Sequence, residues 1–195
     1  MTYKQQPVAL AESVQAALFT GLITVGAYIA VPLPVSPVPI VLQNFFVLLA
    51  ALLLPVRWAT ASVALYLALG AVGLPVFAAA RGGLAHFAGP TGGYLIGFLP
   101  AVAVGSLIAG APTPHTRLRH DVAAVTTATV LVYAVGTPWI AVVMDMNAPA
   151  ALAAGVLPFL PGDALKAVVA VLAARAVRPL LRRSSGPQAG GEDRS

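Results

Sequence analysis

The sequence of 195 residues contains no cysteine and few charges. Without cysteine, a disulfide framework, a thiolate metal site and a thiol nucleophile are excluded. Charged residues make up 9% of the chain, whereas soluble domains average about 25%. The motifs HExxH and GxSxG and the phosphate-binding loop are also missing, and no paired carboxylates lie in register. The composition therefore argues against a soluble enzyme, and the chain cannot hydrolyse ATP by itself.

Long apolar runs are what the sequence has instead, with 59% hydrophobic residues. A membrane-spanning helix needs about 20 mostly apolar residues. Six such spans are predicted, at 11–31, 38–56, 58–77, 93–111, 121–144 and 153–177. We therefore predict an all-α integral membrane protein with one six-helix domain over residues 1–183. The polar segment 184–195 is predicted to be a disordered tail.

The connections between spans also have a clear composition. Prolines at 32, 34, 37 and 39 predict an extended, non-helical first connection. Glycines at 82, 83, 89, 92 and 93 predict an irregular third connection.

The basic residues divide unevenly between the two sides of these spans. Nine of the 11 fall on the side that holds both termini, one (Arg81) on the other, and Lys166 lies inside a span. Cytoplasmic loops of membrane proteins carry the excess of Lys and Arg. We therefore predict a multi-pass protein of the cell membrane with both termini cytoplasmic. The same spacing argues against nucleic-acid binding, because the charges form no soluble patch.

The segment "FLPGDALKA", residues 159–167, places two ionisable residues inside the last apolar span. An Asp or Lys at the bilayer centre costs about 2.5–3.5 kcal/mol on insertion scales. Asp163 and Lys166 are three residues apart, so they share one helix face. Pro161 favours a helix that breaks or restarts there, with Asp163 in its first turn and facing a cavity. A ligand-binding pair and a structural ion pair both remain open.

The glycine-rich segment 73–98 contains further candidate ligand contacts. A loop of this composition cannot face lipid, so it must be buried in protein or line a wet cavity. Phe77 and Tyr94 offer aromatic faces to a ligand, and Arg81 offers a positive charge. Gly83 would allow the backbone to approach a ligand closely.

Two further features lie within the spans. Gln43 places an amide at membrane depth, where ligand contact and a hydrogen bond between helices are equally open. Ala16, Ala17, Thr20 and Gly21 form a face of small residues that would allow close helix contact. That face predicts either packing within the chain or docking of a partner subunit.

Four segments together resemble the BioY family, the biotin-binding S components of energy-coupling factor (ECF) transporters. They are "SPVPIVLQNFFVLLAALLL", "GLPVFAAARGG", "GPTGGYLIGF" and "FLPGDALKA". The resemblance covers residues 13–178. It implies a six-helix S-component fold and capture of biotin from the outer side, without catalytic activity.

The resemblance also implies partners and contacts. Asp163 and Lys166 would contact biotin, and the small face of the first helix would meet a transmembrane coupling subunit. Paired ATPase subunits would hydrolyse ATP, so the chain itself would need no cofactor. The chain has Ala16 and Thr20 where the family has two alanines, which is a departure. An S component for another small vitamin, or a structural membrane protein, is the alternative.

Overall fold

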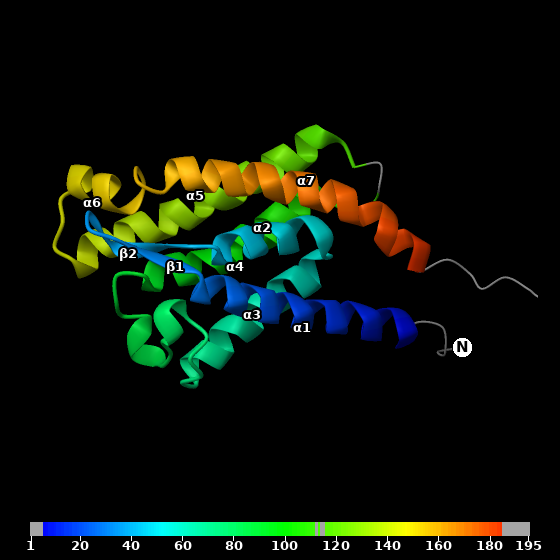
Figure 1. The fold of residues 1–195 in the computed structure, drawn as a ribbon, viewed down its shortest axis with the longest axis horizontal. Coiled ribbons are helices and arrows are strands. Elements are labelled where there is room, and N and C mark those ends of the chain that lie inside the picture. The colour runs from blue at the N-terminus through cyan, green and yellow to red at the C-terminus, as the bar shows by residue number, and fades with distance from the viewer. Residues whose placement is uncertain (1–5, 112, 114–115, 185–195) are drawn as a thin grey trace, which may run out of the picture.

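The structure is a computed structural model that describes residues 6–184 except 112, 114 and 115. Helices and strands follow one another along the chain as shown in Figure 1. The α-helices are α1 (Gln6–Tyr28), α2 (Gln43–Leu53), α3 (Val56–Ala71), α4 (Gly92–Ala109), α5 (Leu118–Val143), α6 (Ala148–Gly155) and α7 (Leu160–Ser184). The other elements are strands β1 (Ala30–Leu33) and β2 (Ser36–Val41) and 3₁₀ helices η1 (Ala78–Ala80) and η2 (Leu84–His86). The predicted tail lies outside the described residues, apart from Ser184 at the end of α7.

The long helices run roughly along one axis, so the molecule has two distinct ends (Figure 1). One end, here called the hairpin end, carries the β1–β2 hairpin, η1, η2 and α6. The other, here called the terminal end, carries the start of α1 and the end of α7. Both ends of the described chain therefore lie at the same end of the bundle.

The hairpin corrects one sequence-based expectation. A helix was predicted from residue 38, but residues 36–41 form strand β2, which pairs antiparallel with β1. Pro37 and Pro39 explain the difference, because proline supplies no backbone N–H and holds the residue before it extended. The all-α class thus describes all but this two-stranded hairpin, and the extended first connection is confirmed.

The helices are also less uniform in length than six equal spans. Among the described residues, three helices are long and apolar enough to cross a membrane, or four if the bent pair α6–α7 is one span. Helices α2 and α3 are apolar but shorter, with 11 and 16 residues. The predicted span 38–56 is divided between β2 and α2, and the predicted span 58–77 ends early, at Ala71.

Small residues allow α4 and α5 to pack closely. A Cβ atom at Gly93 would overlap Trp139, and one at Gly136 would overlap the ring of Tyr94. Tyr94 is thereby held against α5, with its hydroxyl donating to the carbonyl of Gly155 at 2.9 Å. This contact fixes the end of α6 over α4.

The predicted restart of the last span is confirmed. Helix α6 ends at Gly155, α7 begins at Leu160, and the two meet at 49°. Pro161 and Asp163 both fall in the first turn of α7, where a missing N–H and a negative charge are favourable. The break therefore places Asp163 at the positive end of a helix dipole.

A second buried ion pair lies at the terminal end. The carboxylate of Asp121 in α5 accepts from Arg178 in α7 at 2.7 and 3.0 Å and from Arg175 at 3.1 Å. Asp121 is fully buried, and the side chain of Arg178 is 2% exposed. Arg178 also donates to the carbonyl of Leu52 in α2 at 2.9 Å. We call these residues the terminal clamp, because they join α2, α5 and α7.

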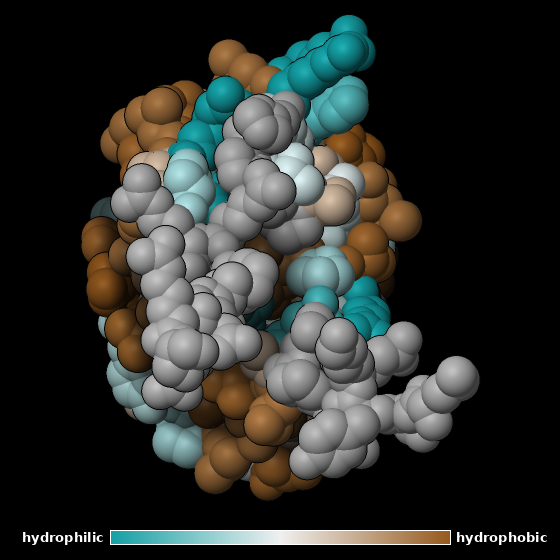
Figure 2. Space-filling model, turned by 90° about the vertical axis from the view of Figure 1, so that its right-hand side faces the viewer, coloured by the Kyte–Doolittle hydropathy of each residue, from teal (hydrophilic) through white to brown (hydrophobic). Residues whose placement is uncertain are grey.

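Figure 2 views the terminal end and shows hydrophilic residues on its face between largely hydrophobic flanks. Exposed basic residues of this end include Arg57, Arg117 and Arg119. The flanks carry large exposed apolar side chains such as Leu18 and Val25 of α1. This distribution matches a bundle surrounded by lipid with a polar end in water.

Candidate ligand-binding site

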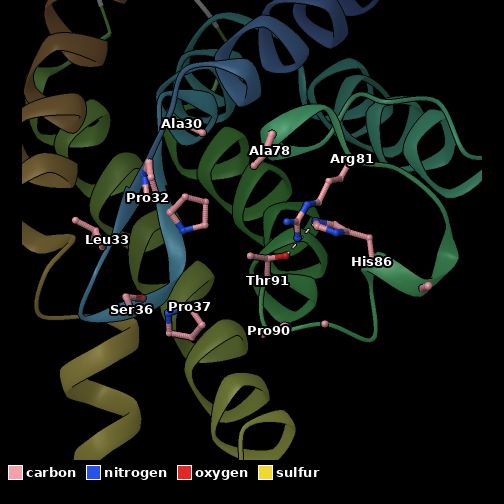
Figure 3. A pocket seen from close by; sticks show the side chains of 14 residues that line it. Ala30, Pro32, Leu33, Ser36, Pro37, Ala78, Arg81, His86, Pro90 and Thr91 are labelled. Carbon is pink, nitrogen blue, oxygen red and sulfur yellow. Dashed lines mark hydrogen bonds between the residues drawn. The ribbon is translucent and has the colours of Figure 1, made fainter.

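A cavity of about 510 Å³ lies at the hairpin end (Figure 3). One wall comes from the hairpin and the other from the segment between α3 and α4. We call it the hairpin cavity. Its lining includes Pro32, Ser36, Pro39, Ala79, Arg81, His86 and Thr91.

A smaller cavity lies next to the hairpin cavity and shares Pro39 with it. This inner cavity, of about 50 Å³, is enclosed by β2, α2, α4, α5 and the start of α7. Its lining is mostly apolar and includes Val38, Tyr94, Phe98, Val132 and Phe159. Its polar groups belong to Asn44, Tyr133, Asp163 and Lys166. A few polar groups among apolar walls are typical of small-molecule sites.

The carboxylate of Asp163 is the centre of the polar groups. Its side chain is 9% exposed. Oδ1 accepts from Asn44 Nδ2 at 2.7 Å and from Lys166 Nζ at 2.9 Å. Oδ2 accepts from the hydroxyl of Tyr133 at 2.5 Å. A buried charge with this many donors is stable where an unpaired one would not be.

Lys166 is held as firmly as Asp163. Its side chain is 13% exposed. Besides Asp163, its ammonium donates to the carbonyl of Val41 at 2.7 Å and to Asn44 Oδ1 at 3.1 Å. An ammonium has three donors, so each has a partner within the chain.

Arg81 points into the hairpin cavity, towards His86 and Thr91 (Figure 3). It follows Ala79 and Ala80, which both have φ near +57° (58° and 56°), a conformation that non-glycine residues rarely adopt. The imidazole of His86 lies 3.1 Å from the Thr91 hydroxyl and stacks on Phe77. Burial, and then the charge of Arg81, lower the pKa of His86 below its ordinary value. The cavity thus carries a permanent cation beside an imidazole that favours its neutral form.

Three of the predicted ligand contacts line the same small space. Asp163, Lys166 and Tyr94 all border the inner cavity, although they come from α7 and α4. Arg81 borders the adjoining hairpin cavity instead. The structure therefore brings these four residues to one end of the molecule.

Three other predicted contacts line neither cavity. Phe77 is fully buried, with its ring 5.4 Å from that of Tyr66. Gly83 adopts φ +95° and donates to the Gly70 carbonyl, which fixes the loop. Gln43 is 2% exposed, and its amide nitrogen has no hydrogen-bond partner among the described residues. These positions shape the framework behind the cavities.

Two polar residues of the inner cavity were not predicted. Asn44 follows Gln43 directly, and the first turn of α2 directs Asn44 rather than Gln43 towards Asp163. Tyr133 lies inside the apolar α5, where a hydroxyl without a ligand or partner would be costly. Because Tyr133 carries no charge, the free-energy cost of burying its hydroxyl was the only feature that could have identified this position from the sequence.

The four small residues predicted to form one face of α1 differ in their exposure. Ala16 and Thr20 are each 5% exposed, and the Thr20 hydroxyl donates to the Ser62 carbonyl of α3 at 2.9 Å. These two residues pack within the chain, which is one of the two alternatives that the sequence left open. Ala17 and Gly21 are exposed on the other side of the helix.

The described residues contain no group of three or more His, Cys, Asp or Glu side chains that could hold a metal ion. A sequence model of the BioY family matches residues 2–183.

The chain belongs to the BioY family. It is 40% identical over 168 residues to the biotin transporter BioY of Thermotoga maritima, covering 86% of this chain and 95% of the relative. It is also 40% identical over 158 residues to the probable biotin transporter BioY of Pyrococcus horikoshii, covering 81% and 90%. These BioY relatives are named as transporters and not as enzymes.

A solved structure has the same fold. The crystal structure of the S-component for biotin from an ECF-type ABC transporter superposes with a TM-score of 0.80 at 28% identity. The superposition covers 92% of this chain and 95% of the other. The expected fold, a helical membrane protein of the S-component type, is thereby confirmed.

Proposed function

We propose that this BioY chain is the membrane subunit that captures biotin for uptake. The observation that carries the proposal is a buried carboxylate, Asp163, beside a mostly apolar cavity at one end of a membrane bundle. Biotin has a ureido ring with two N–H donors, an apolar sulfur ring and an acidic side chain. The inner cavity offers hydrogen-bond acceptors for the N–H groups of the ureido ring and apolar walls for the sulfur ring.

The hairpin cavity suits the remainder of the ligand. The inner cavity, at about 50 Å³, is too small for a whole vitamin, because ligand pockets usually measure about 300–1,000 Å³. The hairpin cavity, at about 510 Å³, lies within that range. We therefore place the ureido ring in the inner cavity and the carboxylate chain in the hairpin cavity, near Arg81.

We further propose that the hairpin end faces outwards in the cell membrane and both termini lie in the cytoplasm. The excess of basic residues at the terminal end supports this orientation. Biotin would then enter from outside through the hairpin cavity. The bilayer would surround the exposed apolar side chains of the flanks.

The energy for transport would come from other subunits. We propose a transmembrane coupling subunit and paired ATPases that hydrolyse ATP, with no cofactor held by this chain. The exposed residues Ala17 and Gly21 of α1 are four residues apart, a spacing that lets a partner helix approach closely. They replace Ala16 and Thr20 as the proposed contact.

Calorimetric titration of the purified, detergent-solubilised chain tests the proposal. Biotin should bind at one site, whereas riboflavin and thiamine should give no heat of binding at the same concentrations. A folded protein that ignores biotin but binds another vitamin would replace the ligand and keep the S-component role. A folded protein that binds none of them would contradict the proposal.

A further inference from the structure

We propose that the terminal end holds a binding site for the headgroup of an anionic phospholipid, formed by Arg117, Arg119 and Arg175. We call these residues the arginine triad; the first two lie at the start of α5 and the third in α7. This site lies away from the two cavities of the hairpin end, and it goes beyond the proposed function. Three features support it, namely a fixed guanidinium, an unbalanced positive charge and apolar side chains beside both.

The guanidinium of Arg175 is fixed by its contacts with the start of α5. Its Nη1 donates to the carbonyl of Thr116 and to the carboxylate of Asp121, both at 3.1 Å. Among the described residues, no hydrogen bond uses its Nε or Nη2, and the side chain is 40% exposed. A guanidinium carries five N–H donors in a planar fork that matches phosphate oxygens. Arg175 can therefore keep both contacts and still donate to a phosphate group.

The loop before α5 places the other two arginines beside Arg175. The hydroxyl and the N–H of Thr116 donate to the carbonyl of Thr113 at 2.9 and 3.2 Å. Thr116 is followed directly by Arg117, whose carbonyl accepts from the first turn of α5 at 2.9 Å. Arg119 follows within that turn, and both arginines are exposed. Because Arg175 holds the Thr116 carbonyl, the arginine triad occupies one corner of the terminal end, where α5 starts beside α7 (Figure 1).

The positive charge of the arginine triad is not balanced within the described part of the chain. Asp121 contacts Arg175, but it accepts two shorter bonds, at 2.7 and 3.0 Å, from the buried Arg178. The charge of Arg178 matches that carboxylate, so three positive charges remain in excess. Neither Arg117 nor Arg119 forms an ion pair with another described residue. Like charges repel one another, and a bound anion would relieve that repulsion.

Exposed apolar side chains border the arginine triad. Leu118 and Val122 are exposed and four residues apart on α5, so they share one helix face. Leu172, three residues before Arg175 on α7, is also exposed. Figure 2 shows hydrophilic and hydrophobic residues meeting at the rim of this end. A phospholipid suits both parts of the surface, because its phosphate pairs with guanidinium groups and its acyl chains cover apolar side chains.

Binding of short-chain phospholipids to the purified chain in detergent tests the site. Dioctanoyl phosphatidylglycerol, which is anionic, should bind more tightly than dioctanoyl phosphatidylcholine, which has no net charge. Each arginine near an anionic lipid surface is worth about 1 kcal/mol, or about fivefold in affinity. The double variant Arg117→Gln/Arg119→Gln should therefore bind phosphatidylglycerol roughly 25-fold more weakly. Equal binding of the two lipids by the wild type, or an unchanged affinity in the double variant, would overturn the proposal.

Two further variants separate a site from general attraction. Arg57→Gln removes an arginine at the same end, but that arginine pairs with Glu12, so the affinity for phosphatidylglycerol should change less than about twofold. A loss as large as that of the double variant would assign the effect to total charge and overturn the site. Arg175→Lys keeps the charge and loses the planar fork, so its affinity should fall. Wild-type affinity in Arg175→Lys would contradict the role of the fixed guanidinium.

Two more experiments test the identity of the ligand. Glycerophosphoglycerol, the same headgroup without acyl chains, should bind much more weakly than phosphatidylglycerol. Equal affinity would show a site for soluble phosphate esters and overturn the lipid assignment. The proposed coupling subunit and ATPases should bind the wild type and the double variant equally. If they bind only the wild type while phosphatidylglycerol binds both alike, the arginines form a protein contact and the proposal fails.

The state of the double variant is checked with biotin. Arg117 and Arg119 line neither cavity of the hairpin end, so a folded double variant should bind biotin as the wild type does. Lipid binding is measured separately from biotin binding. A wild-type chain that binds phosphatidylglycerol but not biotin would therefore contradict the proposed function alone, and the reverse result would contradict the lipid site alone.

Discussion

Two buried acids, each paired with a cation on α7, lie at opposite ends of this molecule. Asp163 meets Lys166 at the hairpin end, and Asp121 meets Arg178 at the terminal end. Asp163 borders the inner cavity, whereas Asp121 and Arg178 line none of the three cavities described. A buried ion pair is therefore not by itself a mark of a ligand site.

The hydrogen bonds show why the two pairs differ. Asp121 accepts three bonds from two arginines, and Arg178 also satisfies the Leu52 carbonyl. Asp163 accepts from three side chains, but one of them is a tyrosine whose oxygen keeps acceptor capacity towards a cavity. Both oxygens of Asp121 are occupied by arginines and line no described cavity, although Arg178 Nε has no partner among the described residues. In this sense the terminal clamp is closed, whereas the Asp163 network borders a cavity and is open to a ligand.

The largest effect is expected from breaking the clamp. Arg178→Met leaves the carboxylate of Asp121 buried with only the half-exposed Arg175, and removing one partner of a buried pair costs about 3–5 kcal/mol. Thermal unfolding in detergent should show a large loss of stability. The fraction that remains folded should bind biotin with wild-type affinity, and a selective loss of affinity would contradict the comparison.

A smaller effect, measured on binding, is expected from Asp163→Asn. The substitution removes a charged acceptor, worth about 1.5–3 kcal/mol, so biotin affinity should fall by roughly 10- to 150-fold. Calorimetry measures the loss, with Asp121→Asn as the control at the other end. Equal loss of affinity in both variants would show that the two acids are not distinct.

The exposed pair between Glu12 and Arg57 should contribute least among the ion pairs. The side chains of Arg57 and Glu12 are 67% and 22% exposed, and exposed pairs are worth about 0.2–1 kcal/mol. Glu12 also accepts from Trp58 Nε1 at 2.6 Å, a hydrogen bond that a glutamine can still accept. Glu12→Gln should therefore change the midpoint of thermal unfolding only slightly, and less at high salt. A loss as large as that of Arg178→Met would show that burial is not what separates the pairs.

The smallest effect concerns pH. Burial and Arg81 lower the pKa of His86 in the folded state from 6.5, so the unfolded chain binds the proton more readily. Stability from this residue is present above pH 6.5 and is lost as pH falls towards the lowered value. Melting at pH 7.5 and 5.5 should show a smaller acid-induced loss in His86→Gln than in wild type. Identical acid-induced losses of stability in His86→Gln and wild type would show that other titratable groups cause the loss.

Much of the fold could be predicted from hydropathy and proline. The apolar runs located α1 to α5 and α7, but not η1, η2 or most of α6. Pro161 correctly indicated the restart of the last span. The hairpin was missed because β2 is as apolar as a helix start, so only the prolines distinguished it. The shortness of α2 follows from the same residues.

The site was only partly predictable from the sequence. Charged residues are easy to recognise in an apolar span, whereas uncharged polar residues are not. Asp163 and Lys166 could be identified, but Tyr133 carries no charge. The choice between Gln43 and Asn44 depended on the exact rotation of α2, which the sequence leaves open. The pair of Asp121 and Arg178 was hidden because residues near span ends are usually solvated.

The central claim is that the open network binds ligand and the closed clamp does not. Its most direct test is calorimetric titration of biotin into Asp163→Asn and Asp121→Asn side by side, each first shown to be folded. We expect the affinity for biotin to fall strongly in Asp163→Asn and to keep its wild-type value in Asp121→Asn. Wild-type affinity in Asp163→Asn would contradict it and return the Asp163–Lys166 pair to a structural role.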